Sequence, residues 1–207
     1  MKRAKYIIGI DEVGRGPLAG PVAVGAVAVP KNFDWKLVSG VRDSKKLTPH
    51  AREEWYKKLQ NLRRAKKLDF FVLFSSVKMI DRRGIVFSIR SALLKCLKQL
   101  GANPRNCEIL LDGSLYAPRN FPAQKTIIHG DDLEPIISMA SIVAKVRRDT
   151  LMKKLAVQYP KYGLDLHKGY GTLLHREAIG RYGLSALHRK SFCRKLIPGL
   201  RPVKKSL

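Results

Sequence analysis

The chain has 207 residues, of which 45% are apolar and 28% are charged, a balance typical of a soluble globular protein with one sizeable core. Lys and Arg number 41 against 16 Asp and Glu, so the net charge is +25 and a polyanion, nucleic acid first, is the expected partner. Charge alone leaves a ribosome-associated or merely basic protein as the alternative. The longest apolar run, 22–29, has the length of a strand and cannot span a bilayer.

The cysteines and the start of the chain indicate a reducing compartment. Cys96, Cys107 and Cys193 are an odd, widely spaced set with neither metal-ligand spacing nor a CxxC pair, so we interpret them as free thiols. The start, MKRAKYIIGIDE, has a basic lead but too few residues before Asp11 for the apolar core of a signal peptide. We therefore expect a cytoplasmic protein.

Two β-rich runs, 5–11 and 21–29, are joined by the segment DEVGRGPLAGP, whose glycines and prolines break any regular element. The two runs predict an antiparallel pair of strands. Side chains alternate faces along a strand, so Asp11 and Glu12 can serve one site only where the strand ends.

A glycine-rich cationic loop follows this acidic pair. For a lone Asp-Glu pair, a solvated turn at a strand end is the ordinary interpretation. Gly14 and Gly16 leave bare backbone N–H groups around Arg15, which a phosphate or a sugar can approach closely. The combination of two acids and this loop favours a metal ion together with a phosphate.

The next stretch, Ser44-Lys45-Lys46-Leu47, predicts a polar turn that leads into a helix of about a dozen residues, with Thr48 as its N-cap. Both lysines are ordinary solvated side chains on the simplest interpretation. A strand is predicted over 70–77.

A helix is then predicted from about residue 81 to residue 100. The helical spacing of Ile85, Val86, Ile89, Leu93 and Leu97 predicts that these five side chains face the core.

Two further short strands end at acidic residues. The run 107–111 leads directly to Asp112, and the run 125–129 leads to Gly130, Asp131 and Asp132. Each acid has an ordinary explanation as a turn residue or as the cap of the following helix. Acids past the ends of sheet strands also occupy the place where open α/β sheets hold their sites.

A long helix is predicted from about residue 135 to residue 156, and its small residues, Ser138, Ala140, Ser141 and Ala144, predict very close packing on the sheet. The segment GLDLHKGYGT follows, in which two glycines expose Tyr170 for stacking on a sugar or a base. A half-buried loop tyrosine is the alternative.

These motifs resemble ribonuclease HII, the type 2 ribonuclease H family. The resemblance rests on DEVGRGPLAGP, DSKKL, the acids after the two later strands, ISMASIVAKVRRD and GLDLHKGYGT, which occur in the family's order between about residues 5 and 196. It implies a ribonuclease H-like α/β fold, with a mixed five-stranded sheet flanked by helices. One catalytic domain, 1–196, would include a small helical C-terminal part, about 157–196, and a basic tail, 197–207, expected to be partly disordered, would follow.

The four acids predict a metal-dependent nuclease if the strand ends converge. Close carboxylates repel one another unless cations lie among them, and hard oxygen ligands select Mg²⁺ or Mn²⁺. Two such ions stabilise the attacking and leaving oxygens of a phosphodiester displacement. The resemblance matches Asp11, Glu12, Asp112 and Asp131 to the family's catalytic metal ligands, and Asp131 is preferred to Asp132 because it directly follows Gly130.

The resemblance implies hydrolysis of RNA in RNA/DNA hybrids and cleavage 5′ of a ribonucleotide embedded in duplex DNA, leaving 3′-OH and 5′-phosphate ends. Such an enzyme would serve ribonucleotide excision in DNA replication and repair. By the same resemblance, Gly14, Arg15 and Gly16 would read the 2′-OH and Tyr170 would stack on the neighbouring deoxyribose. The candidates for phosphate contact are Ser44, Lys45, Lys46, Arg189 and Lys190.

Two other functions were weighed. Ribonuclease HIII has the same chemistry but usually an additional N-terminal domain, for which the position of Asp11 leaves no room. A non-catalytic nucleic-acid-binding protein is favoured by charge alone. We expect a monomer without a membrane partner, and a sliding clamp that docks on the tail is a further hypothesis.

Overall fold

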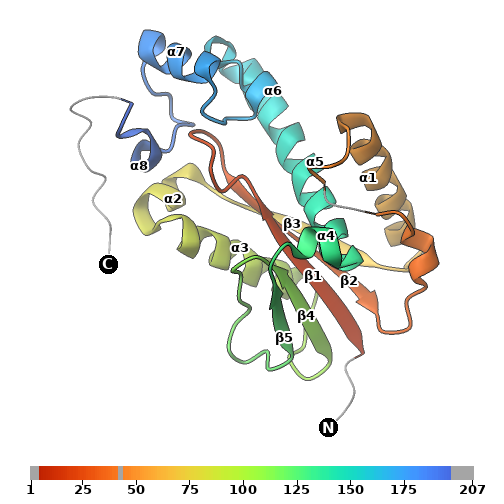
Figure 1. Ribbon diagram of the computed structural model, residues 1–207. Helices are drawn as coiled ribbons and strands as arrows, with labels where there is room; N and C mark the ends of the chain where they lie inside the picture. Colours follow the sequence, from red (N-terminus) through yellow and green to blue (C-terminus); the bar gives the residue numbers. More distant parts are fainter. Residues whose placement is uncertain (1–4, 42–43, 197–207) are drawn as a thin grey trace.

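The computed structural model describes residues 5–41 and 44–196, and within them a five-stranded sheet forms the centre of the molecule (Figure 1). The strand order is β3-β2-β1-β4-β5. β1 is antiparallel to β2 and parallel to β4, β2 is antiparallel to β3, and β4 is parallel to β5. The expected mixed five-stranded sheet is confirmed. The strands are β1 (Tyr6–Val13), β2 (Val22–Pro30), β3 (Asp69–Ser75), β4 (Cys107–Asp112) and β5 (Gln124–Ile127).

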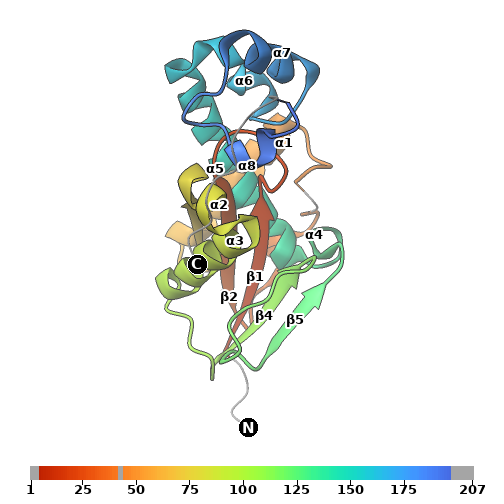
Figure 2. The same ribbon diagram turned by 90° about the vertical axis from the view of Figure 1, so that its left-hand side faces the viewer.

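Helices cover both faces of the sheet and extend beyond one end of it (Figures 1 and 2). Helices α1 and α5 pack on one face, α2 and α3 pack on the other, and α6, α7 and α8 lie past the end of β1. The α-helices are α1 (Pro49–Arg64), α2 (Val77–Arg83), α3 (Ile85–Gln99), α4 (Gly130–Leu133), α5 (Pro135–Gln158), α6 (Leu164–His167), α7 (Leu173–Tyr182) and α8 (Lys190–Cys193), and the 3-10 helices are η1 (Trp35–Val38) and η2 (Pro160–Tyr162). No helix in these two described ranges is long and apolar enough to cross a membrane.

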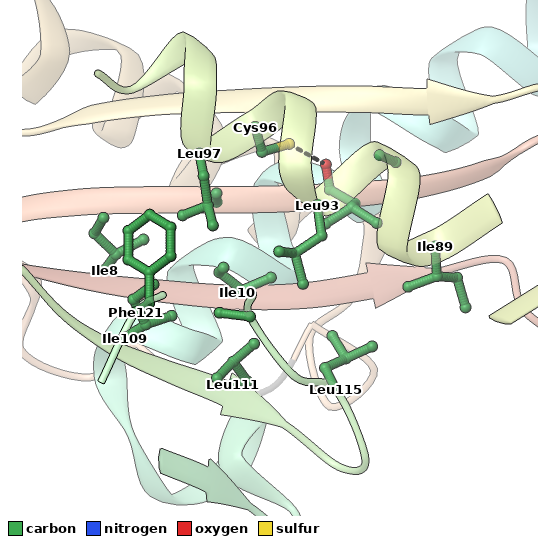
Figure 3. Packing of buried hydrophobic residues seen from close by; sticks show 14 of the residues in the cluster. Ile8, Ile10, Ile89, Leu93, Cys96, Leu97, Ile109, Leu111, Leu115 and Phe121 are labelled. Carbon is green, nitrogen blue, oxygen red and sulfur yellow. Dashed lines mark hydrogen bonds between the residues drawn. The ribbon is translucent and has the colours of Figure 1, made fainter. Parts of the chain in front are cut away.

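The core on the α3 face is formed by alternate residues of the central strands (Figure 3). Ile8 and Ile10 of β1 point toward α3, where Leu93 and Leu97 meet them. The thiol of Cys96 donates to the carbonyl of Val24 at 3.3 Å. Because side chains alternate along β1, Asp11 lies on the opposite face, against α5.

Helix α5 packs very close to the sheet, as its small residues predict. A Cβ built on Gly9 would lie 2.4 Å from the carbonyl oxygen of Ile136, and one on Gly25 would lie 2.5 Å from that of Ala140. Real Cβ atoms do not approach backbone oxygens this closely, so both strands need glycine where α5 crosses them. This contact fixes the helix against β1, next to the acidic residues.

The region predicted as one helix over 81–100 is two helices, and this prediction was wrong. Gly84 separates α2 from α3 with φ +83°, a conformation that favours glycine, and its N–H closes α2 by donating to the carbonyl of Ile80. The side chain of Val86 is 49% exposed and not part of the core, in contrast with its prediction. The predicted cap of α1 is confirmed, since Thr48 accepts a hydrogen bond from the amide of Ala51 at 3.1 Å.

The C-terminal helices enclose a buried cluster of three histidines. His167 and His175 stack with ring centroids 4.3 Å apart, and the Nε2 atoms of His175 and His188 are 3.1 Å apart. Burial, followed by the neighbouring His175, lowers the pKa of His188 to about 4. His188 is therefore neutral at pH 7, and burial lowers the pKa of His167 and His175 as well, so the three rings pack as buried side chains. The tail expected over 197–207 lies outside the described residues.

Candidate functional site

Two acids of the predicted set lie side by side at the ends of neighbouring parallel strands. β1 and β4 pair in the register Ile10↔Leu111, so Asp11 and Asp112 follow this last pair at the same level. The ladder with β4 ends at these acids, whereas β1 itself continues to Val13 along β2. The expectation that β1 ends at the acids therefore holds only on the β4 side. Since Ile10 and Leu111 face α3, both carboxylates face α5.

Asp131 lies against this pair. The peptide amides of Gly130 and Asp131 donate to Oδ1 of Asp112 at 2.8 and 3.4 Å, so the first turn of α4 orients the Asp112 carboxylate. Lys45 binds Oδ2 of Asp131 at 2.9 Å, and Lys46 binds Asp132 at 2.7 Å. Neither Asp131 nor Asp132 caps α5: Glu134 stands at its N-cap position and makes no side-chain capping bond.

Glu12, like Asp112, is partly buried, whereas Asp11 and Asp131 are buried. Its side chain is 13% exposed, and Arg15 donates to its Oε1 at 3.1 Å. Burial raises the pKa of Glu12, with a further contribution from Asp112, while Arg15 opposes the rise. Glu12 therefore joins the acidic cluster electrostatically and already has a cationic partner in the neighbouring loop.

The electrostatics of the cluster favour a bound cation. Burial raises the pKa of Asp11 well above its usual range, Glu12, Asp112 and Asp131 raise it further, and a hydrogen bond from Ser141 opposes the shift. Burial and then Asp131 raise the pKa of Asp112. Carboxylates in this state gain most from hard divalent ions, so the chemistry of the donor set fits Mg²⁺ or Mn²⁺. Among residues 5–41 and 44–196, no three acidic, histidine or cysteine side chains already stand at metal-ligand spacing.

Arg189 binds the backbone of the loop that contains Gly14, Arg15 and Gly16. Its side chain is fully buried and donates to the carbonyls of Gly14 at 2.7 Å, Arg15 at 2.9 Å and Gly20 at 2.9 Å. Burial lowers the pKa of this guanidinium to about 9, yet it keeps its charge at pH 7. The predicted phosphate contact of Arg189 is therefore corrected: its guanidinium is enclosed and binds backbone instead.

A second buried arginine, Arg148 of α5, ties this loop to the segment that carries Tyr170. Arg148 donates to the carbonyls of Pro21 at 3.0 Å, Lys168 at 3.1 Å and Ala19 at 3.4 Å. Sequence reasoning did not single out Arg148, because the local pattern of this largely apolar helix does not distinguish it from the exposed Arg147. Two buried guanidinium groups thus fix the backbone that carries the predicted substrate-reading residues.

Tyr170, the residue predicted to stack on the substrate, is partly open to solvent. Its side chain is 42% exposed, and the Arg148 guanidinium carbon is 6.0 Å from its ring centroid. The amides of Leu18 and Ala19 donate to the carbonyl of Gly169 at 2.8 and 3.2 Å, so the two loops are hydrogen-bonded directly. The structure therefore joins the segment that carries Tyr170 to the loop that follows Asp11 and Glu12.

The remaining candidates occupy different environments. Ser44 is buried, and its hydroxyl lies 2.8 Å from that of Ser141, so it supports the Asp11 neighbourhood and is not exposed to a phosphate. Lys45 and Lys46 are exposed beside Asp131 and Asp132. Lys190 is exposed at the start of α8, and its amide donates to Asp81 at 3.0 Å.

The comparisons with known proteins point to one family. The family model described as ribonuclease HII matches residues 8–195. A ribonuclease HII from Chlamydia pneumoniae is 46% identical over 190 residues, covering 90% of this chain and 82% of the relative.

Solved structures share the fold. Ribonuclease HII from Archaeoglobus fulgidus, solved in a complex with PCNA, has a TM-score of 0.68 and 26% identity, with 89% of this chain and 93% of that chain covered. Ribonuclease H2 from Pyrococcus horikoshii has a TM-score of 0.67 and 27% identity, with 92% and 96% covered.

Proposed function

Because the chain belongs to the ribonuclease HII family and is a ribonuclease H, we propose that it hydrolyses RNA in RNA/DNA hybrids and cuts 5′ of single ribonucleotides embedded in duplex DNA. The products would carry 3′-OH and 5′-phosphate ends. The observation that carries this proposal is the meeting of Asp11 and Asp112 at the end of the β1–β4 ladder, with Asp131 beside them.

We propose that Asp11, Glu12, Asp112 and Asp131 hold two divalent ions, Mg²⁺ or Mn²⁺. When bound, such ions stabilise the attacking and leaving oxygens of an in-line phosphodiester displacement. The protein supplies the orientation, because the amides of α4 fix the Asp112 carboxylate and Ser141 holds that of Asp11. Lys45 and Arg15 pair with Asp131 and Glu12 and would contact the scissile strand once ions occupy the cluster.

The specificity for a ribonucleotide would come from two loops that are hydrogen-bonded to each other, the one that contains Gly14 to Gly16 and the one that contains Tyr170. A Cβ built on Gly16 meets no atom within 4 Å, so the backbone around Arg15 is open to a sugar and can present its amide groups to a 2′-OH. Tyr170 would stack on the deoxyribose that follows the ribonucleotide. Arg148 and the Gly169 carbonyl support this role, because they hold both loops at one fixed spacing.

Location and partners are part of the same proposal. The three cysteines are buried and free, which supports a reducing, cytoplasmic environment. We propose a monomeric enzyme. The Archaeoglobus relative is solved with PCNA, and a clamp contact through 197–207 of this chain stays a prediction.

The test is cleavage of a labelled DNA duplex that contains one ribonucleotide, with Mg²⁺ or Mn²⁺. Wild type should make a single cut 5′ of the ribonucleotide, and Asp112→Asn should make none. Asp34→Asn is the matched control, because this exposed residue caps η1 at the other end of the sheet and asparagine can also cap. A non-catalytic binding protein would give no cut with any variant and equal binding by all of them, which would overturn the proposal.

A further inference from the structure

A groove outside the acidic site runs along α3. One hollow of about 70 Å³ is lined by Arg15, Arg90 and Tyr116 together with neighbouring apolar residues. A second, of about 480 Å³, is lined by Arg90, Leu94, Tyr116 and Arg119, among others. Because Arg90 and Tyr116 border both hollows, the two adjoin, and we call them together the α3 groove. It begins at Arg15, beside the active-site acids.

One wall of the α3 groove is the loop over 113–123, and this loop is held firmly. Leu115 and Ala117 are buried, and Leu115 reaches the core cluster beneath α3 (Figure 3). The Gln124 side chain accepts from the amide of Ala117 at 2.8 Å, and Thr126 donates to the carbonyl of Leu115 at 2.8 Å. Tyr116, between two anchored neighbours, is 58% exposed. An aromatic ring is thus presented to solvent from rigid backbone.

The charge of the α3 groove has one sign. Arg90 and Arg119 are exposed, and no ion pair of the described residues involves either of them. No Asp or Glu lines either hollow. Guanidinium groups that line the same hollow as an exposed aromatic ring form a combination that binds a nucleic-acid strand, since arginines contact phosphates and the ring stacks on bases.

The loop that lines the groove also follows the active site directly in the sequence. Asp112 is the last residue of β4, and the loop that carries Tyr116 and Arg119 starts directly after it. Arg15 borders the groove and binds Glu12. The α3 groove therefore adjoins the acidic cluster at Glu12 and Arg15.

We propose that the α3 groove binds the nucleic-acid strand flanking the cleaved linkage, with Arg90 and Arg119 on phosphates and Tyr116 stacked on a base or sugar. The proposal rests on the nuclease function proposed above and adds to it a second, sequence-independent contact region. It predicts that the enzyme prefers a substrate that extends beyond the ribonucleotide on one side.

The experiment compares Arg90→Gln/Arg119→Gln with wild type on ribonucleotide-containing duplexes that are long on both sides, trimmed on the 5′ side or trimmed on the 3′ side. The matched control is Lys67→Gln/Arg105→Gln, which removes the same charge from exposed positions at the opposite end of the sheet. On the long duplex, KM should rise with kcat unchanged. The slope of log affinity against log salt should fall by about two, so the affinity lost between about 50 and 200 mM salt should shrink roughly tenfold.

Trimming the correct side should remove the difference between wild type and the double variant, and so identify which flank the groove holds. Tyr116→Ala should raise KM roughly tenfold, whereas Tyr116→Phe, which keeps the ring, should not. A double variant that matches the Lys67/Arg105 control in KM and salt slope would overturn the proposal. So would binding of polyglutamate that depends on Arg90 and Arg119 while binding of the duplex does not.

Failure of the nuclease function remains distinguishable from failure of the α3 groove. If wild type cuts none of the duplexes, the function is wrong. Binding of the long duplex in EDTA then decides the groove alone, by whether Arg90→Gln/Arg119→Gln binds more weakly than the control. Equal binding by the two double variants would overturn the proposed role of the α3 groove.

Discussion

Substitution by alanine should lower the stability of the protein at Gly14 but not at Gly16, although both glycines belong to one loop. Gly14 has φ +89°, and a Cβ built on it would lie 2.1 Å from Nε of Arg148. Gly16, two residues later, has open space where a Cβ would be. Gly14→Ala therefore tests whether the loop depends on the buried arginine, and Gly16→Ala tests only access to the loop surface.

The cost of Gly14→Ala has two parts. An alanine in the left-handed region costs roughly 1–2 kcal/mol. The added methyl also displaces the guanidinium of Arg148, which donates to the carbonyls of Pro21, Lys168 and Ala19. Leaving one or more of these buried carbonyls unpaired costs about 1–3 kcal/mol. The free energy of unfolding should fall by about 3–4 kcal/mol, which for a chain of this size lowers Tm by about 10 °C.

The assay is thermal unfolding together with cleavage kinetics of both variants. Gly14→Ala should show the lowered Tm and an impaired kcat/KM. Gly16→Ala should keep the wild-type Tm but raise KM, because its methyl group stands where a sugar would approach the backbone. Equal Tm values for Gly14→Ala and wild type would refute the argument that Arg148 and Gly14 are packed against each other.

Three further outcomes follow from other contacts. Asp11→Asn should abolish cleavage yet raise the Tm of the metal-free protein, because it removes a buried carboxylate that its acidic neighbours repel; retained cleavage would contradict the role of Asp11. The pKa of His188 is about 4 in the folded state against about 6.5 in the unfolded chain, so the unfolded chain binds more protons between these pH values. The free energy of unfolding, measured by urea titration, should therefore fall by up to about 3 kcal/mol as the pH falls from 6.5 toward 4. A free energy that does not change with pH in this range would contradict the burial of His188. Gly9→Ala should prevent stable folding because its methyl would overlap the carbonyl of Ile136, whereas Gly180→Ala, in an open helical position, should gain up to about 1 kcal/mol; similar circular dichroism melts for the two would contradict the packing.

The sheet and the acids were accessible from sequence because local signals point to them. Strand-length apolar runs end at Asp11 and Asp112, and their adjacency then follows from parallel pairing. The break at Gly84 was missed, since a glycine inside an otherwise helical pattern predicts neither its φ nor the cap that it forms.

The role of Arg189 could not be predicted for a different reason. An arginine in a polar, basic segment looks exposed, and its burial depends on carbonyls of residues 14, 15 and 20, far away along the chain. Such contacts carry no pattern in sequence. The same holds for Arg148, which binds the distant carbonyl of Pro21, and for the hydroxyl contact between Ser44 and Ser141.

The hydrogen bonds from Arg189 to the loop after β1 also form late during synthesis of the protein. The carbonyl of Gly14 and the guanidinium that binds it are separated by 175 positions in the chain. A ribosome produces the β1–β2 hairpin early, but the loop between these strands gains its partner only when residue 189 has left the exit tunnel. The nascent chain therefore carries Asp11 and Glu12 long before the loop that follows them has all of its hydrogen-bond partners.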